Sequence, residues 1–335
     1  MLVLFLVALG FTLPKKRKIA WPEKVYNEKN NAPSIEKKEL GRFLFYDPLL
    51  SSDNTVSCSS CHSSYTAFAH TDHPTSHGVN DSVGKRNAPA LFNLAWKRTF
   101  MWDGAIHHLD AQAVAPIENK LEMNETLPHV IAKLNSRKFY RTLFFNAWGD
   151  SLATGERILK SISQFLLSLE STQSKYDQML QGAIEFSEQE KNGYALFQKF
   201  CNACHTEPLF TSNQFASNGI HPVHISDLGR ANVTGIEKDN YLFMIPSLRN
   251  IEFSYPYMHD GQKKSLQEVL NHYSDGKNFG TTASLPLNQK MHLSSKEKQD
   301  IIAFLLTLTD HEFLTNNEYQ FPKPLQHEII QRNRE

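Results

Sequence analysis

Two short motifs of cysteine and histidine are the most informative chemical feature of this sequence. The first, CSSCH, spans residues 58 to 62, and the second, CNACH, spans residues 201 to 205. In a C-x-x-C-H motif the two thiols can bond the vinyl groups of a haem while the adjacent histidine binds its iron. The two motifs therefore predict two covalently attached haem c groups. The cysteines that would bond them are Cys58, Cys61, Cys201 and Cys204, and the proximal iron ligands would be His62 and His205.

Two other uses of paired cysteines suit this sequence less well. A zinc site would need both pairs to converge across the long segment that separates them. A thioredoxin-like redox motif needs a strand-helix-strand context, and strand-like alternation is scarce in this chain. The haem interpretation uses all four cysteines and leaves none for a disulfide.

Composition and charge narrow the class of protein. The chain has 335 residues, of which 40% are hydrophobic and 21% charged, enough for two domains with their own cores. It carries 35 basic and 35 acidic residues, so it lacks the global field typical of proteins that bind nucleic acid or anionic membranes. We therefore expect no nucleic-acid partner, and any charged partner must meet a local patch.

The N-terminal segment, residues 1–20, indicates export. Its first thirteen residues, MLVLFLVALGFTL, are apolar, but the run is shorter than the ~20 residues of a membrane-spanning helix. We expect a signal peptide and a periplasmic location. The basic run PKKRK that follows opposes translocation, so a retained N-terminal anchor, a truncated start and a buried segment are the alternatives.

Helical periodicity dominates the remainder of the chain. Apolar residues recur at helical spacing in 37–47, 107–118, 126–135, 155–171, 187–200 and 294–310, and the region 66–90 has the composition of an irregular loop. Ser187 and Glu190 form a capping-box pattern at the start of one helix. The order helix, cysteine pair, loop and further helices occurs twice, which predicts an all-α fold. The expected domains are 21–180 and 181–312, followed by a tail at 313–335.

Four blocks of sequence carry a family resemblance. Residues 40–62, 84–96, 101–123 and 246–261 resemble, in order, the characteristic blocks of the bacterial di-haem cytochrome c peroxidase and MauG family. The resemblance covers the chain from about Ser34 to Asp310. It implies two cytochrome c-like domains, each with one covalently bound c-type haem, the first peroxidatic and the second transferring electrons. It also implies reduction of hydrogen peroxide with electrons from a small cytochrome c or cupredoxin, and a homodimeric assembly.

The resemblance assigns three catalytic side chains. Glu122, in the sequence LEM, matches the family's distal carboxylate, and Gln112 matches its amide partner. A carboxylate beside an open iron suits peroxide cleavage, because one oxygen must lose a proton and the other must gain one. Trp102, in the sequence MWDG, matches the tryptophan that lies between the two haems.

The resemblance also implies a calcium ion at the domain interface. Asn87, in GKRNAP, matches one of its ligands, and the backbone carbonyls of Ser254 and Pro256 are companion candidates. Amide and carbonyl oxygens suit a hard cation such as Ca²⁺.

The distal ligand of the first iron is left open. Alignment on PTS makes His77 the ligand that ordinary members use in the resting state, with His70 and His73 as rivals. Alignment on the following glycine, as in MauG-like sequences, leaves the iron without a protein ligand on this side.

The distal ligand of the second iron departs from the commonest pattern. The position at which peroxidases of this family carry methionine is Tyr273, which matches the tyrosine ligand of MauG-like members. Met258 and Met291 are the substitutes. Tyr273 therefore keeps a second function open, a MauG-like oxidase that modifies protein side chains. A non-enzymatic electron carrier is the third hypothesis, against which Glu122 and Gln112 argue.

Overall fold

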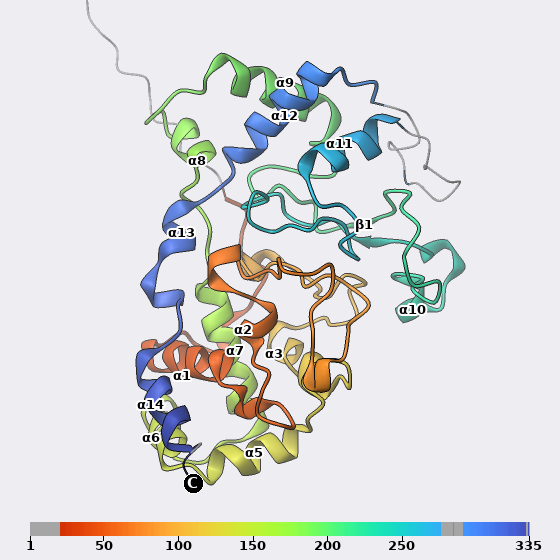
Figure 1. The fold of residues 1–335 in the computed structure, drawn as a ribbon. Helices are drawn as coiled ribbons and strands as arrows, with labels where there is room; N and C mark the ends of the chain where they lie inside the picture. Colours follow the sequence, from red (N-terminus) through yellow and green to blue (C-terminus); the bar gives the residue numbers. More distant parts are fainter. Residues whose placement is uncertain (1–20, 276–283, 285–290, 333, 335) are drawn as a thin grey trace, which may run out of the picture.

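The computed structural model describes residues 21–275, 284, 291–332 and 334. The predicted signal peptide or anchor, residues 1–20, lies outside the described residues. Within them, none of the helices combines the length and the apolar character needed to cross a membrane. The described chain is built from helices joined by long loops, with one small sheet, so the predicted all-α class is confirmed (Figure 1).

The first group of helices surrounds the larger hydrophobic core. Its members are α1 (Ile35–Tyr46), α2 (Cys58–Cys61), α3 (Leu109–Gln112), α4 (Val114–Glu118), α5 (Leu127–Asn135), α6 (Lys138–Trp148) and α7 (Gly155–Ser168). Short 3₁₀ turns lie at Glu28–Asn30, Pro48–Leu50, Ser64–Thr66, Val79–Asp81 and Leu94–Trp96. The predicted helix 107–118 is divided into α3 and α4. Pro116 has no N–H to donate to the carbonyl of Gln112, so a continuous helix is interrupted there.

The second group of helices has a separate, smaller core rich in phenylalanine. Its members are α8 (Lys175–Leu180), α9 (Glu188–Phe200), α10 (Ala231–Thr234), α11 (Leu266–Asp275) and α12 (Ser295–Leu306). A 3₁₀ turn spans Glu237–Asp239, and β1 (Phe215–Ala216) pairs antiparallel with β2 (Phe243–Met244). The capping box predicted for α9 is confirmed: Glu190 accepts a 2.7 Å hydrogen bond from the Ser187 N–H.

The same helix crossing occurs in both groups. In the first, Gly41 of α1 lies against α7, where an added Cβ would stand 1.9 Å from the carbonyl oxygen of Ser161. In the second, Gly193 of α9 lies against α12, where an added Cβ would stand 1.8 Å from the carbonyl oxygen of Asp300. Each glycine thus allows two helix backbones to touch beside a C-x-x-C-H motif.

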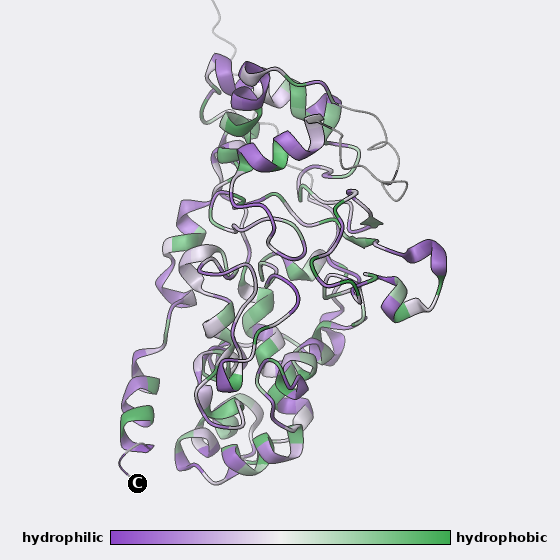
Figure 2. Cartoon of the chain, turned by 45° about the vertical axis from the view of Figure 1, so that its right-hand side comes forward, coloured by the Kyte–Doolittle hydropathy of each residue, from purple (hydrophilic) through white to green (hydrophobic). Residues whose placement is uncertain are grey.

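The C-terminal segment runs back over the first group. After α12 the chain forms α13 (His311–Thr315), a 3₁₀ turn at Asn317–Tyr319 and α14 (Lys323–Arg332), which pass along α1 (Figure 1). Leu325 is fully buried in the first core, and Arg332 forms a bidentate ion pair with Asp47 at 2.8 and 3.0 Å. Figure 2 shows hydrophobic and hydrophilic stretches alternating around the helices, as expected for helices that are half-buried.

A buried polar network fixes the linker between the two groups. Asn93 exchanges two hydrogen bonds with the backbone of Ser171, at 2.9 and 3.0 Å. Asp310 accepts hydrogen bonds from the N–H groups of Thr172 and Gln173, at 2.8 and 2.9 Å. These bonds end α7 at Ser168, earlier than the predicted residue 171, because the following backbone groups bond outside the helix.

The helix crossing gives a stability prediction. Gly193→Ala should destabilise the protein by about 1–3 kcal/mol, because the new methyl group must push α9 away from α12. The midpoint of thermal unfolding, followed by circular dichroism, should fall. Asn192→Ala, at the exposed neighbouring position of α9, is the control and should leave the midpoint near the wild-type value. Equal midpoints for the two variants would contradict the close crossing.

Candidate functional site

The first cavity brings together the first cysteine motif and the predicted catalytic side chains. Its volume is about 440 Å³, and it is lined by Cys61, His62, Gln112, Glu122 and Trp102, among others. These residues come from α2, α3 and the loops around them. The structure therefore places the candidate proximal histidine, carboxylate and amide around one space.

His62 has the geometry of a proximal iron ligand. Its Nδ1 lies 2.8 Å from the carbonyl oxygen of Phe68. Because a carbonyl oxygen only accepts, Nδ1 must carry the proton, which leaves the lone pair of Nε2 for a metal. Burial lowers the pKa of His62 to about 4, so the ring is neutral at pH 7.

Glu122 is held at the cavity by a neighbouring loop. The carbonyl oxygen of Glu122 accepts a 2.8 Å hydrogen bond from the N–H of Val79. Gly78 makes this approach possible, since an added Cβ would lie 2.2 Å from the carbonyl oxygen of Leu121. The side chain accepts a 2.6 Å hydrogen bond from Asn119. Burial raises the pKa of Glu122, and the Asn119 amide partly offsets that rise.

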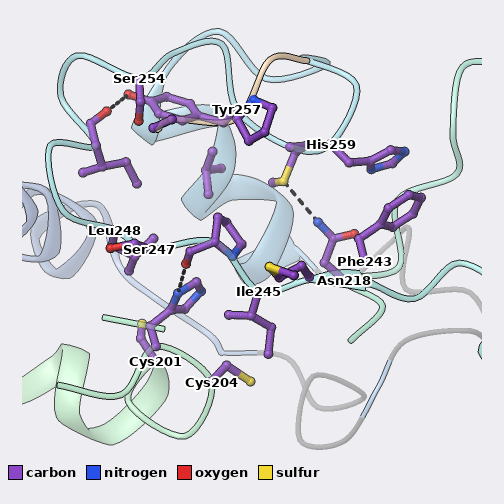
Figure 3. Close-up of a pocket in the computed structure, with 18 of the residues that line it drawn as sticks. Cys201, Cys204, Asn218, Phe243, Ile245, Ser247, Leu248, Ser254, Tyr257 and His259 are labelled. Atoms are coloured by element: carbon purple, nitrogen blue, oxygen red, sulfur yellow. Dashed lines mark hydrogen bonds between the residues drawn. The ribbon is translucent and has the colours of Figure 1, made fainter. Parts of the chain in front are cut away.

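The second cavity is built around the second cysteine motif. It has a volume of about 220 Å³ and is lined by Cys201, Cys204 and His205 together with apolar residues of α11 and α12. Figure 3 shows Cys201 and Cys204 on one side of this space and Asn218, Ile245 and His259 around it.

His205 repeats the arrangement seen at His62. Its Nδ1 lies 3.2 Å from the carbonyl oxygen of Phe210 and 3.1 Å from that of Pro246. Nδ1 must again carry the proton, so Nε2 is available to iron. Burial lowers the pKa of His205 to about 4.

All three candidates for the distal ligand of the second iron line this cavity: Tyr273, Met258 and Met291. The sulfur of Met258 accepts a 3.1 Å hydrogen bond from the side chain of Asn218. Burial raises the pKa of the Tyr273 phenol to about 12, and a hydrogen bond with Asn218 opposes the rise. Tyr273 would therefore have to lose a proton on binding iron as a phenolate.

The two cavities share a wall. Residues that line both include Asn87, Pro89, Lys97, Trp102, Met244 and Pro246. The Trp102 indole donates a 2.8 Å hydrogen bond to the carbonyl oxygen of Asn87, and the Trp102 carbonyl accepts a 2.7 Å bond from the N–H of Met244. Trp102 thus lies where the sequence predicts an aromatic bridge, between the two cavities.

The candidate calcium ligands lie at the second cavity. Asn87, Ser254 and Pro256 all line it, and the Asn87 side chain donates a 3.0 Å hydrogen bond to the carbonyl oxygen of Pro74. In the described part of the chain, no group of three or more His, Cys, Asp or Glu residues is placed to hold a metal. Calcium here would have to use amide and carbonyl oxygens.

The histidines of the 66–90 loop lie together but outside the lining of the first cavity. The His73 ring stacks on that of His70, with centroids 5.9 Å apart, and lies tilted against that of His77, with centroids 4.7 Å apart. His77 is hydrogen-bonded to Asp81, and Ser76, the residue before it, lines the cavity instead. This placement favours the alignment that leaves the first iron open.

The sequence did not predict the charged cluster at the first cavity, which Arg86 and Asp227 line. Arg86 forms a bidentate ion pair with Asp227, at 2.6 and 2.8 Å, and a 2.6 Å bond to Asp103. Burial alone would raise the pKa of Asp227, but the bonds from Arg86 outweigh it and lower that pKa. Arg86 and Asp103 belong to GKRNAP and MWDG, two of the sequence blocks that carry the family resemblance, so the sequence marked these two segments as important. Asp227 lies outside those blocks, and no sequence pattern identified it.

The residues fit two covalent haem groups. None of the four cysteines forms a disulfide. Burial raises the pKa of Cys58 and Cys201 to about 12, so both are neutral thiols that lack the thiolate character of reactive or zinc-bound cysteines. Each pair stands beside a cavity into which the adjacent histidine can present Nε2.

Comparisons with known proteins agree with the presence of haem c. A family model described as "Di-haem cytochrome c peroxidase" matches residues 35–185, and one described as "Cytochrome c" matches residues 190–309. The chain is 34% identical to "Methylamine utilization protein MauG" of Methylorubrum extorquens, across 88% of this chain and 84% of that protein. It is 34% identical to "Cytochrome c551 peroxidase" of Nitrosomonas europaea, across 82% of this chain and 80% of that protein.

A solved structure is also similar over nearly the whole chain. The crystal structure of "a MauG-like protein associated with microbial copper homeostasis" aligns with a TM-score of 0.80 and 30% identity. The alignment covers 94% of this chain and all of that one.

The position of His77 leads to a spectroscopic prediction. Electron paramagnetic resonance of the oxidised protein as isolated should show one high-spin haem, because no histidine of the 66–90 loop lines the first cavity. His77→Ala should leave this spectrum unchanged. Two low-spin haems in the oxidised protein, one becoming high-spin only after addition of one electron, would instead make His77 the resting ligand.

Proposed function

Because this chain belongs to the di-haem cytochrome c peroxidase family, we propose that this oxidoreductase reduces hydrogen peroxide to water. The observation that carries the proposal is the convergence of His62, Gln112 and Glu122 on one cavity. A plain electron carrier needs no carboxylate and amide facing an iron site.

The overall reaction consumes one peroxide, two electrons and two protons and yields two waters. Bound haem supplies the iron at which peroxide is reduced. Glu122 would supply the proton transfer: its carboxylate would take a proton from one oxygen of peroxide and return it to the other, which leaves as water. The raised pKa of Glu122 suits both steps, since the group must accept and then release a proton. The Gln112 amide can orient peroxide by hydrogen bonding.

The shared wall provides the route between the two sites. Trp102 lines both cavities, and hydrogen bonds at its indole and its backbone hold it there. We propose that electrons cross this wall through the indole ring. They would come from a small cytochrome c or cupredoxin in the periplasm, docking at the second domain, residues 181–312. A calcium ion held by Asn87, Ser254 and Pro256 is proposed to stabilise the wall.

The second candidate is a MauG-like oxidase that uses peroxide to modify side chains of another protein. Tyr273 at the second cavity favours it, because a phenolate ligand stabilises oxidised iron more than methionine does. One assay distinguishes the two functions. A peroxidase oxidises reduced small cytochrome c continuously when peroxide is added, whereas a MauG-like enzyme without its protein substrate does not.

Replacing the carboxylate tests the assignment of Glu122. Glu122→Gln should lower kcat for peroxide reduction by roughly 10²–10⁴-fold, because the amide cannot accept the proton. The haem content, measured as the pyridine haemochrome, should remain at two per chain. Glu118→Gln, at an exposed position four residues earlier, is the control and should retain full activity. Full activity of Glu122→Gln would remove Glu122 from the mechanism.

The pH dependence tests the same group. Since burial raises the pKa of Glu122, the carboxylate becomes protonated at a higher pH than an exposed glutamate does. The rate should therefore fall on acidification with a midpoint above the ordinary value of 4.5. Asn119→Ala removes the hydrogen bond that lowers the pKa, so its midpoint should move to still higher pH. A midpoint unaffected by Asn119→Ala would show that another group controls the acid limb.

A further inference from the structure

Lys97 is the charged residue of the shared wall that the proposed reaction does not use. It follows the 3₁₀ turn Leu94–Trp96 and lines both cavities. Its N–H bonds back to the carbonyl oxygen of Leu94, at 3.1 Å, which fixes the backbone at this point. Its amine makes no hydrogen bond or ion pair with any of the described residues.

The carboxylates that line the first cavity have other partners than Lys97. Asp227 is paired with Arg86, and Glu122 accepts a hydrogen bond from Asn119. Burial lowers the pKa of Lys97 to about 8, and no carboxylate counteracts that effect. Lys97 is half-buried, and an ammonium group largely withdrawn from water without a partner is unfavourable, so this position favours either a neutral amine or a bound anion.

Covalent haem would bring anions to both cavities. Its two propionate carboxylates lie on the edge of the macrocycle opposite the vinyl groups that bond cysteine, so they extend away from each cysteine pair. No cysteine lines both cavities: Cys61 lines the first, and Cys201 and Cys204 line the second. Lys97, in contrast, belongs to both linings, and an ammonium group has three N–H donors.

We propose that Lys97 is a shared counter-ion, whose ammonium group binds a propionate of each haem across the wall between the two cavities. The proposal rests on the haem content assigned above, and it adds a residue that sets redox potential. A positive charge at the propionates offsets their negative charge and favours the reduced form of each iron. Lys97 would therefore hold both potentials higher than the haem ligands alone would set them.

Redox titration of the purified di-haem protein, without peroxide, tests this role. Lys97→Met removes the charge and keeps a chain of similar length. We expect it to shift the oxidation equilibrium of both haems at least tenfold toward the ferric form, a fall of about 59 mV for each one-electron couple. Lys97→Arg should restore most of the loss. Arg98→Met removes a charge from the exposed adjacent residue, which lines neither cavity, and should shift neither potential.

Haem content is measured first, as the pyridine haemochrome, so that loss of haem is distinguished from loss of the counter-ion. If Lys97→Met does not retain two haems, Lys97→Gln takes its place.

Resonance Raman spectra should show displaced propionate bending modes in the neutral variants. Unchanged potentials in a neutral variant that retains both haems would overturn the proposal. So would a shift confined to one haem, or an equal shift in Arg98→Met. A wild-type protein with two haems but no peroxidase activity would refute the proposed function and leave this test intact.

Discussion

The ion pair between Arg86 and Asp227 is the interaction on which the arrangement of the two sites depends. Arg86 lies in the first half of the chain and Asp227 in the second, and the same guanidinium also bonds Asp103, the residue after Trp102. The cluster is buried or half-buried, so removing one partner would leave an uncompensated charge at a cost of several kcal/mol, about 3–5 for a buried pair. It ties the two helical groups together at the first cavity, which Arg86 and Asp227 both line.

The two sites share a scaffold and differ in the chemistry of their distal sides. In each, a glycine allows two helices to cross closely, and a histidine Nδ1 is bonded to backbone carbonyl oxygen. The first cavity then presents Gln112 and Glu122, whereas the second presents Met258, Met291 and Tyr273 among aliphatic side chains. A polar distal side suits proton transfer, and an apolar one with a soft or phenolic ligand suits electron storage. The difference between the two cavities therefore lies in side chains from α3, α11 and the loops around them, and not in the close helix crossings that both groups share.

Local sequence patterns predicted much of this structure but could not predict its long-range contacts. The sequence predicted the cysteine motifs, the amphipathic helices and the Ser187 capping box, because each depends on residues that are close in sequence. The pairing of Arg86 with Asp227 joins residues 141 positions apart, and no local pattern identifies such a partner. For His77, spacing alone could not decide between two alignments. In the structure the His77 side chain is hydrogen-bonded to Asp81, and the preceding residue, Ser76, lines the first cavity.

The central claim, that Glu122 and the first haem site reduce peroxide with electrons delivered through the second, is tested most directly by stoichiometry. Reduced small cytochrome c and a limiting amount of hydrogen peroxide would be mixed with a catalytic amount of the protein, and oxidation of the cytochrome followed by absorbance. We expect repeated turnover in which two cytochromes are oxidised for each peroxide consumed. Peroxide that remains unconsumed, or that disappears without oxidation of the donor, would contradict it.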